Sequence, residues 1–184
     1  MKPRGQLMIE HRLIEKYLAR AAARIEATPE SAWDPLLVDS VVDFIRTYAD
    51  RTHHGKEEDI LFAELGKRSL RPPDAEGMRE LLAEHRLARE KVREIVALNG
   101  QYRAGDLGVV TRIKEIVAWL AAFYPVHIRK EDARFFPDTE KYFEPQELAT
   151  MLSQFNDFDR AMIHEKYRAA LDQLVGEERA PGKA

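Results

Sequence analysis

The sequence of 184 residues contains no cysteine. Disulfide frameworks, thiolate zinc sites, iron–sulfur clusters and cysteine nucleophiles are therefore excluded. Glycine and proline are also sparse, with nine residues of each, which excludes collagen-like and low-complexity chains. The net charge of −3 gives no general attraction to nucleic acid or to an anionic membrane, so we expect neither as a partner.

Long apolar runs are missing too. One of the longest, residues 117–126, is about half as long as a membrane span. Glu10, His11 and Arg12 follow the basic first residues too closely to leave room for the apolar segment of a secretion signal. We therefore expect a cytoplasmic protein, and the length fits one domain with a core of its own.

Apolar residues recur at helical spacing through most of the chain. They predict helices at about residues 6–27, 35–67, 74–98 and 106–134, with a fifth helix that begins near Pro145. Asn99 and Gly100 are typical of a helix end. No alternating pattern with turn signals predicts a strand. We therefore predict an all-α fold, an antiparallel up-down-up-down four-helix bundle with an additional C-terminal helix.

The predicted helices divide the chain into three parts. Residues 1–140 form the bundle, and residues 141–176 form a C-terminal helix that packs on the bundle or at a dimer interface. Residues 177–184 form a disordered tail. The surplus helix leaves a homodimer open as one arrangement of the protein.

The two halves of the predicted bundle form an internal repeat with one constant offset. Residues 10–13 have the same sequence as residues 84–87, and the same offset places His53 on His127. Each of the four histidines in this repeat lies on an apolar stripe of its helix. Polar groups at such core positions need partners.

The repeated His-x-x-x-Glu spacing predicts a metal site. Residues four apart share one helix face and lie about 6 Å apart along the axis, so both side chains of each pair can point into the bundle. The imidazole would bind one ion, and the two carboxylate oxygens can bridge two ions. Nitrogen and oxygen donors without sulfur suit iron, manganese or zinc. The predicted ligands are His11, His53, Glu57, His85, His127 and Glu131.

The register at the adjacent histidines 53 and 54 has to be chosen, because His54 and Glu58 have the same spacing as the first pair. The offset of the internal repeat places His54 on an isoleucine, so we choose His53 as the ligand. His54 is then expected to be exposed or to stand behind the ligands. His164 has an arginine four residues later, and we expect it at the surface or in packing.

The order of a lone histidine, a His-x-x-x-Glu pair, a second lone histidine and a second pair resembles the hemerythrin-like, or HHE cation-binding, family. The segments 53–62 and 127–137 are typical of that family, and the resemblance covers about residues 8–137. It implies an antiparallel four-helix bundle that holds two iron ions, bridged by the two carboxylates and an oxo or hydroxo group. Zinc or manganese could occupy the same ligands in a purified sample.

The resemblance also implies a function, the binding or sensing of a small oxidant at the metal pair. Dioxygen, nitric oxide and peroxide are the candidates. A di-iron oxidoreductase in nitric oxide or peroxide stress, or in iron handling, is the alternative. A regulatory module that reports metal occupancy through the fifth helix is a further alternative, and the sequence does not decide whether the protein is an enzyme.

Two positions near the predicted ligands need a separate interpretation. Oxygen-carrying hemerythrins have a second histidine four residues after the one on the third helix, and Arg89 stands there in this chain. Arginine cannot bind a cation, so we expect Arg89 at the surface and a histidine fewer at the metals, which favours turnover over reversible oxygen binding. Glu15, one turn from His11, is open as a further ligand, although a solvated carboxylate among basic residues is favoured.

Overall fold

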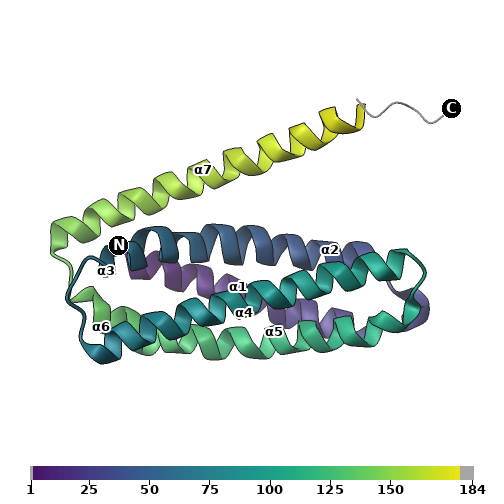
Figure 1. Ribbon diagram of the computed structural model, residues 1–184, viewed down its shortest axis with the longest axis horizontal. Coiled ribbons are helices and arrows are strands. Elements are labelled where there is room, and N and C mark those ends of the chain that lie inside the picture. Colours follow the sequence, from purple (N-terminus) through teal and green to yellow (C-terminus); the bar gives the residue numbers. More distant parts are fainter. Residues whose placement is uncertain (1, 179–184) are drawn as a thin grey trace.

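The computed structural model describes residues 2–178 of the chain, with side chains up to Met162. Every regular element in this range is helical, and the elements form five consecutive segments (Figure 1). Four segments lie side by side as an antiparallel bundle, and the fifth rises away from one end of it (Figure 1). The predicted all-α bundle with an additional C-terminal helix is therefore confirmed.

Three of the segments are single helices, namely α1 (Pro3–Ala27), α4 (Pro72–Arg103) and α7 (Pro145–Glu178). The other two segments combine α-helix with stretches of π-helix. The second segment consists of α2 (Pro35–Phe44), the π-helices η2 (Ile45–His54) and η3 (Glu57–Phe62), and α3 (Ala63–Leu65). The fourth consists of the 3₁₀ turn η4 (Leu107–Val109), α5 (Val110–Lys130), the π-helix η5 (Glu131–Phe135) and α6 (Phe136–Glu140). A 3₁₀ turn, η1 (Glu30–Ala32), links the first two segments.

The third helix does not end at Asn99, where the sequence predicts its end. Asn99 is buried, and its side-chain amide donates to the Pro35 carbonyl at 3.0 Å and to the Asp39 carboxylate at 2.8 Å. These bonds tie α4 to the start of α2. The helix continues to Arg103, and the left-handed residue that follows it is Gly105, with φ of 103°.

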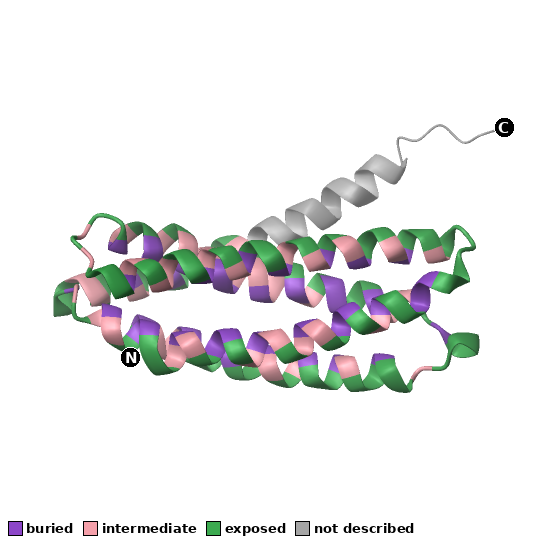
Figure 2. Cartoon of the chain, turned by 60° about the horizontal axis from the view of Figure 1, so that its bottom comes forward, coloured by how far each residue is buried: buried purple, intermediate pink, exposed green. Residues whose placement is uncertain are grey.

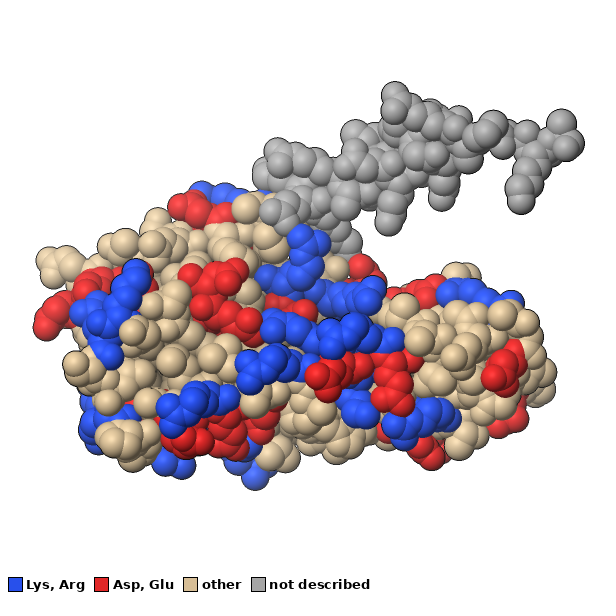
Figure 3. Space-filling view, viewed as in Figure 1, with Lys and Arg blue, Asp and Glu red and all other residues tan. Residues whose placement is uncertain are grey.

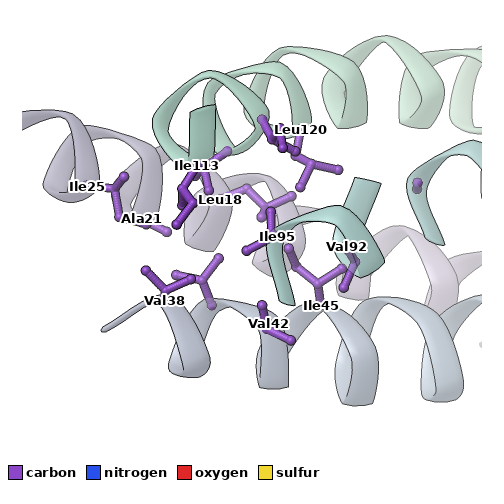
Figure 4. Close-up of a cluster of buried hydrophobic side chains, with 14 of the residues drawn as sticks. Leu18, Ala21, Ile25, Val38, Val42, Ile45, Val92, Ile95, Ile113 and Leu120 are labelled. Atoms are coloured by element: carbon purple, nitrogen blue, oxygen red, sulfur yellow. The ribbon is translucent and has the colours of Figure 1, made fainter. Parts of the chain in front are cut away.

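The apolar core consists of two clusters along the bundle. One cluster fills the part in which Leu18, Ile95 and Ile113 point toward one another from α1, α4 and α5 (Figure 4). The other lies at the end near α3 and α6 and contains Leu7. His11 is buried between the two clusters. It lies one helical turn after Leu7 of the second cluster and one turn before Ile14 of the first cluster. Buried residues face the bundle axis throughout (Figure 2). The two clusters therefore enclose a polar layer.

In the part of the chain that the structure describes, helix α7 makes its main contacts with α1, η2 and η3. Met151 and Phe155 are buried in this contact, and Phe158 lies against Gly55. A Cβ atom on Gly55 would stand 2.7 Å from the ζ carbon of that ring, so the close approach needs a glycine. Helix α7 reaches Glu178 and thus includes the first two residues of the predicted tail. Residues 179–184 and the side chain of His164 lie outside the described part.

The outer surface carries acidic and basic side chains side by side (Figure 3). Within residues 2–178, no helix combines the length and the apolar character that crossing a membrane requires.

Candidate metal centre

Seven side chains that can bind metal meet in the polar layer between the two core clusters. They come from all four segments of the bundle, and each is at most 2% exposed. They are His11 of α1, His53, His54 and Glu57 of η2 and η3, His85 of α4, and His127 and Glu131 of α5 and η5. The structure therefore brings together all six predicted ligands and adds His54.

The seven side chains form two groups. His54, His85 and His127 make one group, and His11, His53, Glu57 and Glu131 make the other. Within each group, one ligand atom of every member lies within 4.8 Å of those of the other members. Two groups of donors are the arrangement expected for a pair of ions.

The carboxylates of Glu57 and Glu131 lie between the three-histidine group and the two histidines of their own group, His11 and His53. Oε1 of Glu57 lies 3.3 Å from Nε2 of His53, and its Oε2 lies 3.5 Å from Nε2 of His85. Oε2 of Glu131 lies 3.2 Å from Nε2 of His11, and its Oε1 lies 3.3 Å from Nε2 of His127. Two donor atoms that each lie about 2.1 Å from one ion, with a right angle between the two bonds, are about 3 Å from each other. Each carboxylate thus turns one oxygen toward each group, at separations that suit shared ions.

The donor atoms of the centre are buried without hydrogen-bond partners. Within the described part of the chain, this holds for Nε2 of all five histidines and for all four oxygens of the two glutamates. An unsatisfied buried polar atom costs about 1–3 kcal/mol, so nine of them around one point are a large penalty for a protein without a ligand there. A cation pair removes this penalty. Five imidazoles and two carboxylates without sulfur fit iron, manganese or zinc.

The other ring nitrogen of each histidine, Nδ1, faces a carboxylate. The Nδ1 to carboxylate distances are 2.7 Å for His11 to Asp132, 2.8 Å for His53 to Glu10, 3.3 Å for His54 to Asp50, 2.7 Å for His85 to Glu58, and 2.8 Å for His127 to Glu84. With Nδ1–H donating outward, the Nε2 lone pair points into the centre, as in carboxylate–histidine–metal arrangements. Sequence reasoning missed these five acids. Four of them follow the internal repeat at the same offset as the ligands, and that was the available signal.

Protons compete with metal for the centre. Burial lowers the pKa of His11, but the Asp132 hydrogen bond and the Glu131 and Glu57 carboxylates outweigh burial and raise it to about 10. The pKa of His85 rises to about 9 against the effect of burial, through Glu131, Glu58 and Glu57. Burial and the neighbouring imidazoles hold the pKa of His54 well below its usual range. Metal binding must therefore displace protons from some of these histidines and not from all.

The expectation left two places open for His54, and the first of them, an exposed position, is wrong. It is 1% exposed, and its ring stacks on that of His85 with centroids 3.8 Å apart. The prediction rested on the internal repeat, which pairs His53 with His127 and leaves His54 opposite Ile128, and in an α-helix two consecutive residues are turned by about 100° onto different faces. Both histidines lie in the π-helix η2, whose wider turn reduces the rotation between neighbours, so both rings face inward. The buried cluster therefore contains five histidines, one more than the predicted ligand set.

Arg89 lies beside the centre and supports it. Its side chain is 30% exposed, its Nε donates to Asp50 at 2.8 Å, and its Nη2 donates to Glu58 at 2.8 Å. Those carboxylates hold Nδ1 of His54 and His85, so Arg89 fixes the acceptors of two candidate ligands. A fifth histidine, His54, is thus buried in the cluster beside the four that the sequence predicts as ligands.

Glu15 stands outside both groups. It pairs with Arg12 at 2.9 Å on the surface of α1, in agreement with the favoured interpretation as a solvated carboxylate.

Aromatic rings close the centre from several sides. Phe136 stacks on His11, Phe62 on His85, and Phe123 on His127, with centroids 5.9, 6.1 and 5.8 Å apart. Such an apolar wall limits the access of water and sets the polarity around a metal.

The comparison with protein families agrees with this geometry. The family model described as the hemerythrin HHE cation-binding domain matches residues 3–139, which is most of the chain and includes every side chain of the centre. No curated protein and no solved structure shows a significant match. The chain belongs to the hemerythrin HHE cation-binding family, and its buried histidines and glutamates form clusters that fit a metal site.

Proposed function

We propose that the protein holds two iron ions in the polar layer and binds a small oxidant there, with dioxygen, nitric oxide and peroxide as the candidates. The observation that carries this proposal is the set of nine buried donor atoms without partners, divided into two groups by two glutamates. An iron pair, when bound, would supply electrons that a small oxidant can accept.

The donor set is unequal between the two groups, and this supports binding of a ligand. Three imidazoles and one oxygen from each glutamate provide five protein donors on one side. Two imidazoles and the remaining two oxygens provide four on the other. Iron commonly takes up to six donors. The side of His11 and His53 is therefore the one that this chain leaves less filled.

The chain's own residues would then keep the site ready for a ligand. The carboxylates at Nδ1 hold each imidazole in one tautomer with its lone pair inward. The aromatic wall at Phe62, Phe123 and Phe136 keeps bulk water from the donors. A dry site with fixed donors favours a small, uncharged or singly charged guest over a bulky substrate.

The second candidate function is a di-iron oxidoreductase that consumes nitric oxide or peroxide. The argument for it from sequence was a histidine fewer than in oxygen carriers. The five histidines of the centre remove that argument, so binding is the function that the geometry supports best. We propose that the protein works in the cytoplasm.

Absorption spectroscopy of the reduced, iron-loaded protein under anaerobic conditions tests this proposal. We expect a spectral change that saturates at about one equivalent per iron pair with at least one of the three oxidants. His53→Ala should abolish it, whereas Glu15→Gln, a change outside both groups, should leave it intact. Consumption of many equivalents would favour the oxidoreductase, and no response to any oxidant would contradict the proposal.

A further inference from the structure

Helix α7 lies beyond residues 3–139, the part of the chain that the family model matches, and yet one of its side chains is connected to the metal centre. A carboxylate oxygen of Asp159 lies 2.7 Å from Nζ of Lys56, which is completely buried and also pairs with Glu10. Glu10 in turn holds Nδ1 of His53 at 2.8 Å. Four side chains in contact thus join α7 to a candidate ligand.

The other half of the bundle builds the same arrangement without α7. Lys130, the counterpart of Lys56 in the internal repeat, pairs with Glu84 and Glu80, which both belong to α4. Glu84 holds Nδ1 of His127 at 2.8 Å. Each of the two lysines therefore has two carboxylate partners, and one of these partners holds a candidate ligand.

The two halves differ in the source of the second carboxylate. At the repeat position of Glu80, α1 carries Gln6, a neutral side chain that cannot neutralise a lysine. The amide of Gln6 instead donates at 2.8 Å to the second carboxylate oxygen of Asp159. A glutamine thus stands where the other half has its own acid, and it holds in place the acid that α7 supplies.

This half of the bundle also depends more strongly on its second carboxylate. Lys56 is completely buried, whereas the side chain of Lys130 is 35% exposed and is reached by water. A buried cation depends on its partners, since water cannot replace them. Without Asp159, Glu10 would have to serve as the counter-ion of Lys56 by itself, and its hydrogen bond to His53 would weaken.

We propose that Asp159 of α7 is a positioning residue of the metal centre, which acts through Lys56 and Glu10 to hold His53 with Nε2 directed at the ion. Docking of α7 and binding of the metal then strengthen each other by the same factor. His53 belongs to the group with four protein donors, the side that the proposed function leaves open to a ligand. The proposal rests on the metal pair of that function and not on its reaction with an oxidant.

Titration of the metal-free 184-residue chain with zinc chloride, in competition with a chromogenic chelator, tests the proposal by measuring the affinity for each ion. Zinc suits these donors and does not change its oxidation state. We expect Asp159→Asn to weaken the binding of one ion about tenfold and to leave the other unchanged. Loss of a group that directly orients a ligand costs about 10–100-fold in metal affinity, and Asp159 lies further out, so the lower end applies.

Two variants separate the role of the carboxylate from a general loosening of α7. Asp157→Asn is the matched control, because Asp157 lies on the same helix and pairs with the exposed Arg160, and it should bind both ions like the unchanged protein. Gln6→Glu, added to Asp159→Asn, gives α1 the carboxylate that Glu80 provides on α4. It should restore most of the lost affinity, which a variant that merely loosens α7 would not allow.

Hydrogen exchange of α7, followed by mass spectrometry, provides the reciprocal measurement. Zinc should slow the exchange of residues 145–162 in the unchanged protein, because metal binding stabilises the docked helix. This slowing should be lost in Asp159→Asn and retained in Asp157→Asn.

Three results would overturn the proposal. The first is equal affinity of the unchanged protein and Asp159→Asn for both ions, and the second is a loss of affinity that Asp157→Asn shares and Gln6→Glu does not reverse. The third is exchange of α7 that is the same with and without zinc. Each of them, together with an intact response of the iron-loaded protein to oxidants, would leave the proposed function standing. The expected zinc affinities without any response to oxidants would contradict the proposed function alone.

Discussion

Replacement of Lys56 by methionine is expected to lower the stability of the protein far more than replacement of Lys130. Lys56 is completely buried under α7, where its Nζ pairs with Glu10 and lies 2.7 Å from a carboxylate oxygen of Asp159. Glu10 in turn holds Nδ1 of His53 at 2.8 Å. One chain of contacts therefore joins the metal centre to the fifth helix.

The internal repeat provides the control. Lys130 is the counterpart of Lys56 in this repeat and pairs with Glu84, which holds Nδ1 of His127. No helix covers Lys130 in the described part of the chain, and its side chain is 35% exposed. The two lysines thus share the contact to a glutamate that holds a histidine, but the second partner of Lys56 is Asp159 of α7 and that of Lys130 is the half-exposed Glu80.

The magnitudes follow from this difference. Methionine keeps most of the volume of Lys56 but leaves two carboxylates without their cation, and loss of one partner of a buried pair costs about 3–5 kcal/mol. An exposed pair such as that of Lys130 contributes about 0.2–1 kcal/mol. For a chain of this size, 1 kcal/mol changes Tm by about 2–4 °C. We therefore expect Tm to fall by about 10 °C for Lys56→Met and by less than about 4 °C for Lys130→Met.

Thermal unfolding of the metal-free proteins, followed by circular dichroism, measures both changes without a contribution from bound metal. Equal and small losses for the two variants would show that α7 does not bury Lys56 in solution, and the reasoning would be refuted.

Three further predictions concern other parts of the molecule. His54→Ala should lower the metal content from two ions per chain to about one, because it removes one imidazole of the three-histidine group; unchanged content by mass spectrometry would exclude His54 as a ligand. Asp74→Asn should cost about 2 kcal/mol at pH 7, since Arg71 and Tyr142 lower the pKa of Asp74 to about 2. A carboxyl whose pKa is lower in the folded than in the unfolded state stabilises the fold above the unfolded pKa of about 4, and this stabilisation is lost as the pH falls toward 2. Urea unfolding at pH 3 should therefore show about half of the stability difference that separates the two proteins at pH 7. Removal of metal should lower Tm, because the ion binds only the folded centre, and equal melting of the two forms would be evidence against a buried site.

The fold and most of the centre could be predicted because they depend on periodicity. Helical spacing fixes which residues share a face, and the constant offset of the internal repeat pairs His53 with His127. The structure accordingly brings the six predicted ligands into one layer.

The features that the sequence did not predict depend on departures from α-helix or on tertiary contacts. His54 is buried at the end of the π-helix η2, an element that no simple periodicity predicts. Asn99 continues α4 because its amide reaches α2, a contact that overrides its local preference for a helix end. The role of Lys56 becomes visible only when α7 covers it, since Lys130 has the same local sequence context and remains exposed.

The metal content of the unmodified protein tests the central claim most directly. The protein would be produced with iron in the medium, purified without affinity metals, and measured by inductively coupled plasma mass spectrometry against the protein concentration. Two groups of buried donors that share two glutamates predict two ions per chain, with both ions lost in a variant that lacks Glu57 and Glu131 together. One ion or none in the unmodified protein, after loading with an excess of iron, would contradict the account.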